Sequence, residues 1–321
     1  MSTSLDQLLA SPDAYFHSFD GGEAVFVPMD RAAYARSVFL DRRIRPAGEG
    51  LWRVPLAQLA GHVPPAQAIR WIFHMAHCGS TLLANALEAL TDDIVLREPF
   101  ALRQLGLELD DTRLATALGL LSRRYPGGGA TLVKANVPVN FILPQLSAAQ
   151  AQAPAIFLYC ELEDYLLAIL RSPDHRAWLR NVTGLLAGHL GDLSALADAE
   201  LCAALWLAMR RRYVAALAAM PQGRSLDSER FFGAPQDVLA AAAQLFGLDA
   251  HPDRIAEVAT GPLFTTYSKN PSQAFDNAAR LARRDALAID LADELTLARD
   301  WIAANAPDAS EVAAGLAKAE L

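Results

Sequence analysis

Short apolar runs alternate with longer amphipathic segments from Ile69 onward, and this alternation constrains the fold more than any other feature. Such alternation is typical of βαβ units around a parallel sheet. The expected strands are 69–75, 93–97, 131–135 and 155–159, and the expected helices are 80–90, 112–123, 139–150, 162–171, 194–220 and 235–248. The sequence therefore predicts an α/β fold of three layers, in which helices flank a parallel sheet.

Residues 1–65 have a different pattern. Two strand-like runs, 15–20 and 23–28, are separated by Gly21 and Gly22, which predicts a β-hairpin, and a short helical stretch follows over 31–40. Proline and glycine clusters at 46–50 and 63–65 are typical of a linker. We expect a small N-terminal α+β subdomain over 1–65 and a main domain over 66–321 with a helical C-terminal part.

Composition argues against several classes of function. The net charge of −8 disfavours general binding of nucleic acid, although one local cluster of donors suffices for a small anionic ligand. The chain lacks a long uncharged apolar run and a secretion signal, so we expect a soluble, cytoplasmic protein that is not bound to a membrane. Cys78, Cys160 and Cys202 have neither disulfide nor metal-ligand spacing, so we expect reduced thiols and no metal.

The stretch Ala76-His77-Cys78-Gly79-Ser80-Thr81 joins the first strand of the main domain to the next helix. Backbone N–H groups in such a turn converge on one point, where the helix N-terminus adds roughly half a positive charge. Gly79 lets the backbone approach an anion, while Ser80 and Thr81 either donate to phosphate oxygens or only cap the helix. The pattern G-x-x-x-x-G-K-[ST] is not met, which disfavours ATP hydrolysis. We therefore expect a P-loop-type fold whose loop binds a different anion.

This loop resembles the 5'-phosphosulfate loop of sulfotransferases, P-[KR]-S-G-[ST]-T. Ala76, His77 and Cys78 replace its first three residues, and the following Gly-Ser-Thr-Leu matches. Further segments resemble sulfotransferase segments in family order, and these are 95–100, 132–138, 156–168 and 225–248. The chain is thus similar to a divergent, bacterial-like sulfotransferase of the type that uses 3'-phosphoadenosine 5'-phosphosulfate.

The resemblance implies roles for individual residues. Glu98 would be the general base for an acceptor hydroxyl, unless it only forms a surface pair with Arg97. Lys134 would stabilise charge on the leaving phosphate with His77 as a hydrogen-bond donor, unless it is a solvated cation. The residues implied in binding the co-substrate are His77, Cys78, Gly79, Ser80, Thr81, Arg171 and Ser172.

Two positions depart from the family at the turn that binds the 3'-phosphate. Cys160 stands at the arginine position and Ala168 at the serine position, so Arg171 and Ser172, about one helical turn further on, would substitute. The glycine-rich R-K-G-x-x-G segment of cytosolic animal enzymes is replaced by the stretch 267–270 (Tyr-Ser-Lys-Asn) and Arg280.

The function that follows is transfer of a sulfuryl group from the nucleotide to a hydroxyl or amine of an unknown small-molecule acceptor, without a metal. Two alternatives stay open. One is a catalytically silent nucleotide- or anion-binding protein on the same fold. The other is an ATP-dependent small-molecule kinase, which would need a loop lysine and a metal-holding acid. The sequence does not indicate the oligomeric state.

Overall fold

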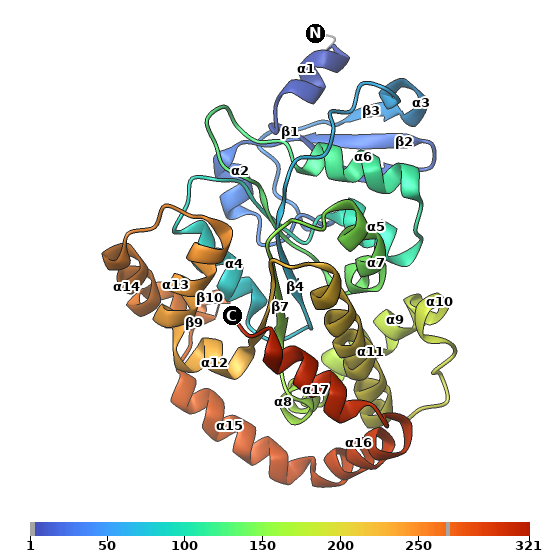
Figure 1. Ribbon diagram of the computed structural model, residues 1–321, viewed down its shortest axis with the longest axis vertical. Coiled ribbons are helices and arrows are strands. Elements are labelled where there is room, and N and C mark those ends of the chain that lie inside the picture. Colours follow the sequence, from blue (N-terminus) through green and yellow to red (C-terminus); the bar gives the residue numbers. More distant parts are fainter. Residues whose placement is uncertain (1–3, 268–269) are drawn as a thin grey trace.

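Five parallel strands form the central sheet of the computed structural model, which describes residues 4–267 and 270–321 (Figure 1). They are β4 (Arg70–His74), β5 (Val95–Arg97), β6 (Leu132–Lys134), β7 (Ala155–Tyr159) and β8 (Gly223–Asp227), in the spatial order β5-β6-β4-β7-β8. Of these five strands the middle one, β4, comes first in sequence; β5 and β6 then lie on one side of it and β7 and β8 on the other. The strand order therefore reverses beside β4, and open parallel sheets bind ligands outside the carboxyl ends of the strands at such a reversal.

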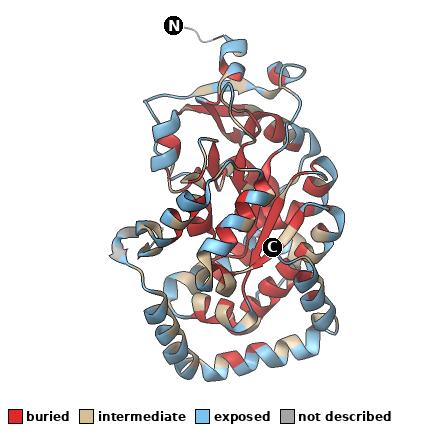
Figure 2. Ribbon diagram, turned by 60° about the vertical axis from the view of Figure 1, so that its left-hand side comes forward, coloured by how far each residue is buried: buried red, intermediate tan, exposed pale blue. Residues whose placement is uncertain are grey.

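Helices cover both faces of this sheet, and its central strands are accordingly rich in buried apolar residues (Figure 2). β4 and β7 are buried at every residue. The helices are α4 (Ser80–Glu88), α5 (Phe100–Leu107), α6 (Asp111–Leu121), η1 (Val137–Ile142), α7 (Leu143–Ala149), α8 (Leu162–Leu170), α9 (Pro173–Leu185), α10 (Ala187–Leu190), α11 (Asp198–Ala219), α12 (Ser228–Gly233), α13 (Pro235–Phe246), α14 (Pro252–Thr260) and η2 (Pro262–Phe264). The predicted α/β class with a flanked parallel sheet is confirmed.

One expected helix, 139–150, is divided. A 3-10 helix, η1, ends at Ile142, and α7 begins anew at Leu143. Pro144 lies in the first turn of α7, where its missing N–H costs nothing because first-turn N–H groups have no partner within a helix. A proline there is compatible with the start of a helix but not with the interior of a longer one.

The N-terminal residues form a small antiparallel sheet with the order β1-β2-β3 (Figure 1). Its elements are α1 (Leu5–Ala10), β1 (Ala14–Asp20), β2 (Glu23–Pro28), α2 (Arg31–Arg36), β3 (Trp52–Pro55) and α3 (Leu56–Leu59). The expected hairpin is present, since Asp20 pairs with Glu23 around Gly21 and Gly22. β1 packs on α5 and α6, and one continuous hydrophobic core joins the two sheets. Separate domains over 1–65 and 66–321 stay a prediction.

The C-terminal part is helical, as expected, and forms an arch below the sheet in Figure 1. It contains a β9 (Thr266–Tyr267) and β10 (Asn270–Ala274) pair, α15 (Asn277–Asp290), α16 (Ala292–Asn305) and α17 (Ala309–Lys318). α15 has no buried residue. After α17 the chain covers the outer edge of β8, because Leu321 N donates to Ser225 O and Ser225 N donates to Ala319 O. Ser268 and Lys269 of the 267–270 stretch lie outside the described residues.

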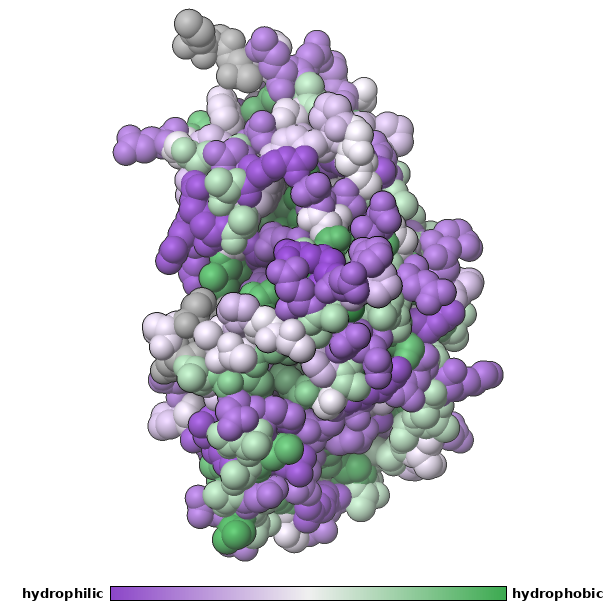
Figure 3. Space-filling view, turned by 90° about the vertical axis from the view of Figure 1, so that its left-hand side faces the viewer, coloured by the Kyte–Doolittle hydropathy of each residue, from purple (hydrophilic) through white to green (hydrophobic). Residues whose placement is uncertain are grey.

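Over residues 4–267 and 270–321, no helix has both the length and the apolar character that crossing a bilayer requires. The face in Figure 3 is largely hydrophilic, with apolar side chains in small separate groups. The large apolar side chains that are exposed in the described chain are Leu51, Leu185, Ile289 and Leu297.

Candidate functional site

The loop between β4 and α4 lies at the carboxyl edge of the sheet, as the sequence predicted. His77 (φ 62°) and Gly79 (φ 84°) both have left-handed backbone conformations. A Cβ on Gly79 would lie 2.8 Å from Cζ of Phe232, so glycine is needed here both for the backbone angle and for space. The buried Cys78 thiol donates to Met75 O at 2.6 Å, across the turn. Cys78 therefore holds the shape of the loop, whereas its neighbours His77 and Gly79 line a cavity.

Ser80 and Thr81 begin α4, and both are buried. No side chain caps this helix. Within the described chain, Thr81 Oγ1 has no hydrogen-bond partner, although it is inaccessible to solvent. Leaving a buried hydroxyl unpaired costs about 1–3 kcal/mol. An unpaired hydroxyl beside an uncapped helix N-terminus is suited to an anionic ligand, because both would then be satisfied together.

A first cavity of about 250 Å³ opens beside this helix N-terminus. Among the described residues, its charged lining contains four arginines and two carboxylates, an excess of positive charge in a protein of net charge −8. Its lining residues are His77, Gly79, Ser80, Thr81, Leu82, Cys160, Asp164, Leu167, Ala168, Arg171, Ser228, Glu229, Phe232, Thr266, Tyr267, Phe275, Arg280, Arg283, Arg284 and Leu287. Such a cavity favours a ligand that has more than one negative charge.

The arginines of the first cavity come mostly from α15. Arg280 donates to both carboxylate oxygens of Glu229 at 2.7 Å, and its guanidinium carbon lies 4.4 Å from the centre of the Phe232 ring. Arg284 lies 3.4 Å from an oxygen of Asp164. Burial raises the pKa of Asp164, and the nearby Glu229 charge adds to this effect. The two acids therefore offset only part of the positive charge.

Arg171 was predicted to bind the co-substrate, and the structure places it in the wall of the first cavity. It forms no ion pair with an acid in the part of the chain that is described. Burial lowers its pKa. Ser172 does not line the cavity, because its hydroxyl accepts a hydrogen bond from His175 N (3.3 Å) and caps α9.

Cys160 and Ala168 form an apolar part of the same wall. Burial raises the pKa of the Cys160 thiol well above its usual value, so this side chain is neutral. The charged side chains of this wall include Arg280, Arg283 and Arg284. The sequence analysis had indicated Arg280 but not Arg283 or Arg284, since nothing in the sequence shows that α15 lies beside the loop.

A second cavity, of about 650 Å³, lies on the other side of the loop. His77 and Ser80 line both cavities. The second is further lined by Phe39, Asp41, Arg42, Arg43, His74, Ala76, Glu98, Phe100, Arg103, Gln104, Leu107, Lys134, Asn136, Val137, His175, Trp178, Val182 and Leu185. The ring of His77 lies 4.1 Å from that of His175 and 5.8 Å from that of Trp178, measured between ring centres.

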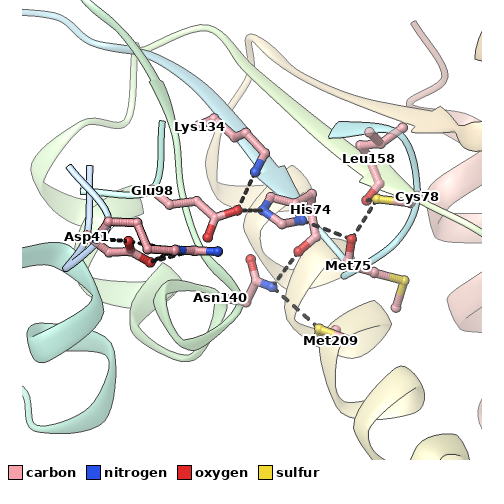
Figure 4. Close-up of polar contacts among 10 residues, drawn as sticks. Asp41, His74, Met75, Cys78, Glu98, Lys134, Asn140, Leu158 and Met209 are labelled. Atoms are coloured by element: carbon pink, nitrogen blue, oxygen red, sulfur yellow. Dashed lines mark hydrogen bonds and ion pairs between the residues drawn. The ribbon is translucent and has the colours of Figure 1, made fainter. Parts of the chain in front are cut away.

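Glu98, Lys134 and His74 meet in the second cavity, at the ends of three adjacent strands (Figure 4). The Lys134 ammonium donates to Glu98 Oε1, and His74 Nε2 lies 3.7 Å from the same oxygen. Glu98 has a left-handed backbone (φ 57°), which is costly for a residue other than glycine, and its N–H donates to Lys134 O at 2.7 Å. Two contacts with Lys134 thus hold this carboxylate at the cavity.

The sequence left two alternatives open, a surface pair of Glu98 with Arg97 and a solvated Lys134, and both are wrong. Arg97 does not pair with Glu98, since it is buried and donates to Glu88 (2.6 Å) and to backbone carbonyls that include Ser37 O. Lys134 is not a solvated cation, because only 1% of it is exposed. It lines the second cavity and not the first, and its ammonium contacts Glu98. His74, which the sequence indicated only as a strand residue, belongs to this cluster.

The described residues contain no group of three His, Cys, Asp or Glu side chains that could hold a metal ion.

Comparison with known proteins finds similar solved structures. The chain resembles the sulfotransferase domain from the curacin biosynthetic pathway (13% identity, TM-score 0.43, 71% of this chain and 98% of that chain). It resembles a sulfotransferase from Alicyclobacillus acidocaldarius (14%, 0.37, 74% and 99%) and mouse sulfotransferase SULT7A1 complexed with PAP (10%, 0.34, 76% and 72%). No family model and no curated protein matches. Likeness at this level does not carry over residue roles or substrates, which depend on the geometry of this chain.

Proposed function

We propose that this chain is a sulfotransferase, which moves a sulfuryl group from 3'-phosphoadenosine 5'-phosphosulfate to a hydroxyl or amine of a small-molecule acceptor. One observation carries the proposal. Two cavities meet at the strand-to-helix loop, where His77 and Ser80 line both, and the first is rich in arginine while the second contains the Glu98 carboxylate. A group-transfer enzyme needs this arrangement, because donor and acceptor must meet at one point.

The arginine-rich lining of the first cavity suits a nucleotide with several negative charges, and when bound the nucleotide supplies the activated sulfuryl group. The α4 N-terminus, which has no side-chain cap among the described residues, would hold the phosphate next to that group, and the unpaired Thr81 hydroxyl would donate to it. Arg171, with the arginines of α15, would hold the second phosphate in place of the family's arginine and serine. The Phe232 ring offers a flat apolar surface in the same wall.

In the second cavity, Glu98 would accept the proton of the acceptor hydroxyl. Lys134 and His74 act as positioning residues, since their contacts are with the Glu98 carboxylate. This differs from the role at the leaving phosphate that the sequence suggested for Lys134. The α4 N-terminus and His77 would instead stabilise the negative charge that transfer leaves on the phosphate.

The first test is binding of adenosine 3',5'-bisphosphate, measured by calorimetry. We expect saturable binding to the wild-type protein and affinity about tenfold lower for Thr81→Val, which removes the hydroxyl and keeps the shape. Thr116→Val, at a half-buried position of α6 that lines neither cavity, is the matched control and should bind like the wild type. The proposal fails if millimolar bisphosphate gives no binding.

The second test separates an enzyme from a silent binding protein. Glu98→Gln should lower the rate of sulfuryl transfer at least about a hundredfold while leaving bisphosphate affinity intact, because the amide cannot accept the proton. Glu108→Gln, at an exposed position after α5, is the control. Equal transfer rates for Glu98→Gln and wild type would contradict the role of Glu98 as the general base. Bisphosphate binding without transfer to any acceptor in a broad panel would favour the silent protein.

A further inference from the structure

The second cavity has a composition that restricts the acceptor. Its reactive end is the Glu98 cluster, and its walls include aromatic and aliphatic side chains, among them Phe100, Trp178, Val182 and Leu185. Leu185 is 45% exposed, which is unusual for a large apolar residue of this chain. An apolar ligand in the cavity would cover it. A volume of about 650 Å³ suits a small organic molecule.

The charges in this cavity do not balance. Asp41 pairs with Arg43, whose Nε and Nη2 both bond its carboxylate, and Glu98 pairs with Lys134. Burial alone would raise the pKa of Asp41, but hydrogen bonds from Arg43 outweigh this effect and lower it, so the acid remains a charged partner of Arg43. Both carboxylates of the cavity are thereby matched by cations.

Two further guanidinium groups, those of Arg42 and Arg103, line the same cavity. Neither has an ion pair or a side-chain hydrogen bond with any residue that the structure describes. Arg42 lies 5.4 Å from the centre of the Phe100 ring, and Arg103 follows Phe100 by three residues on α5, so Phe100 and Arg103 lie on the same side of that helix. The remaining titratable groups facing the cavity, His74, His77 and His175, add no negative charge.

From this arrangement we propose that the acceptor is a hydroxylated carboxylic acid with an apolar body, whose carboxylate is bound by Arg42 and Arg103 while its hydroxyl faces Glu98. The planar fork of a guanidinium matches a carboxylate in geometry and charge. With the carboxylate bound by the two arginines, a hydroxyl elsewhere on the apolar body would be able to reach Glu98, which lines the same cavity. This inference rests on the proposed sulfotransferase function only for the fate of the hydroxyl, because the recognition of the acid can be measured without turnover.

The test compares acids with their neutral methyl esters. The probes are para-hydroxyphenylpropionate and omega-hydroxydodecanoate, each beside its methyl ester, with direct binding measured by calorimetry and transfer measured with the sulfuryl donor. We expect each acid that binds to bind about tenfold more tightly than its ester, and this ratio to fall toward one in Arg42→Gln and in Arg103→Gln. Arg45→Gln, an exposed arginine outside both cavities, should keep the wild-type ratio.

Failure of this inference and failure of the proposed function give different results. If the bisphosphate binds and transfer occurs, but neither acid binds more tightly than its ester, the acceptor inference is overturned and the function stands. If acid binding depends on Arg42 and Arg103 but no transfer occurs, the inference about the acid stands and the proposed sulfotransferase function is rejected. An acid preference that is unchanged in both arginine variants also overturns the inference, because the carboxylate is then bound elsewhere.

Discussion

Arg70 and Asp93 form an ion pair at the amino end of the sheet, opposite the proposed site. Arg70 Nη1 lies 2.5 Å from Asp93 Oδ2 and also donates to Ala130 O at 2.8 Å, and the two side chains are 9% and 12% exposed. Asp93 additionally accepts a hydrogen bond from Gly129 N. The Asp93 carboxylate therefore links the start of β4 to the glycine-rich turn 127–129, and this turn has a structural role.

Replacing this carboxylate should destabilise the fold in a pH-dependent way. We expect Asp93→Asn to lower the free energy of unfolding by about 3 kcal/mol at pH 7, since Arg70 would stay buried without a counter-charge. Burial alone would raise the pKa of Asp93, but hydrogen bonds from Arg70 and Gly129 outweigh it and lower the pKa. The stabilisation is thus present above the unfolded-state pKa, about 3.9, and is lost as pH falls through the lower folded-state value.

Urea unfolding of wild type and Asp93→Asn from pH 7 to pH 2 measures this effect. The difference between the two proteins should be constant down to about pH 5 and shrink at lower pH. Asp92→Asn, the exposed neighbour, should match the wild type throughout. A difference that is as large at pH 2 as at pH 7 would contradict the ionic explanation.

At the scale of single residues, the sequence led to Glu98 and Lys134 through a family resemblance, but not to their partnership. Each follows or ends a short strand, and their contact depends on β5 lying beside β6. His74 reaches the same carboxylate because β4 is the next strand over. Strand order is a long-range property, so local pattern could not reveal that these three side chains form one cluster.

Among the elements, the turn into α4 depends most on a single residue. Gly79→Ala should weaken binding of adenosine 3',5'-bisphosphate at least about tenfold, because a Cβ would collide with Phe232 and displace the N–H groups that face the anion. Gly50→Ala is a matched control, since Gly50 also has a positive φ (94°) but a Cβ there meets no atom within 4 Å. Calorimetry should show wild-type affinity for Gly50→Ala. Equal affinities for the two variants would argue against an anion at this turn.

The sequence predicted the elements whose apolar pattern is strong and missed those whose burial comes from tertiary contacts. The run 155–159 was predicted with its observed bounds. β8, Gly-Arg-Ser-Leu-Asp, was not predicted as a strand, because its buried Ser225 is polar and is satisfied by Leu316 O, far along the chain. α15 owes its place to ion pairs with Glu229 and Asp164, which sequence spacing does not show.

In the whole molecule, the N-terminal part contributes to one cavity and not to the other. Phe39, Asp41, Arg42 and Arg43 line the second cavity, whereas the described residues that line the first all come from position 77 or later. Arg123 ties the N-terminal segment to α6: its buried guanidinium donates to the carbonyls of Leu8, Leu9, Ser11 and Ala14. Burial lowers the pKa of Arg123 to about 10, so it stays charged at neutral pH.

Removing this cation should loosen the N-terminal part and affect the two cavities unequally. We expect Arg123→Met to lower the free energy of unfolding by about 3 kcal/mol, because buried carbonyls lose their donor, and to speed hydrogen exchange in α1 and β1. Binding of the proposed acceptor should weaken more than bisphosphate binding, since only the second cavity is lined by Phe39, Asp41, Arg42 and Arg43. Arg124→Met, the adjacent and less buried arginine, is the control. An equal loss of both ligands would mean that the N-terminal part supports the whole sheet and not the acceptor cavity in particular.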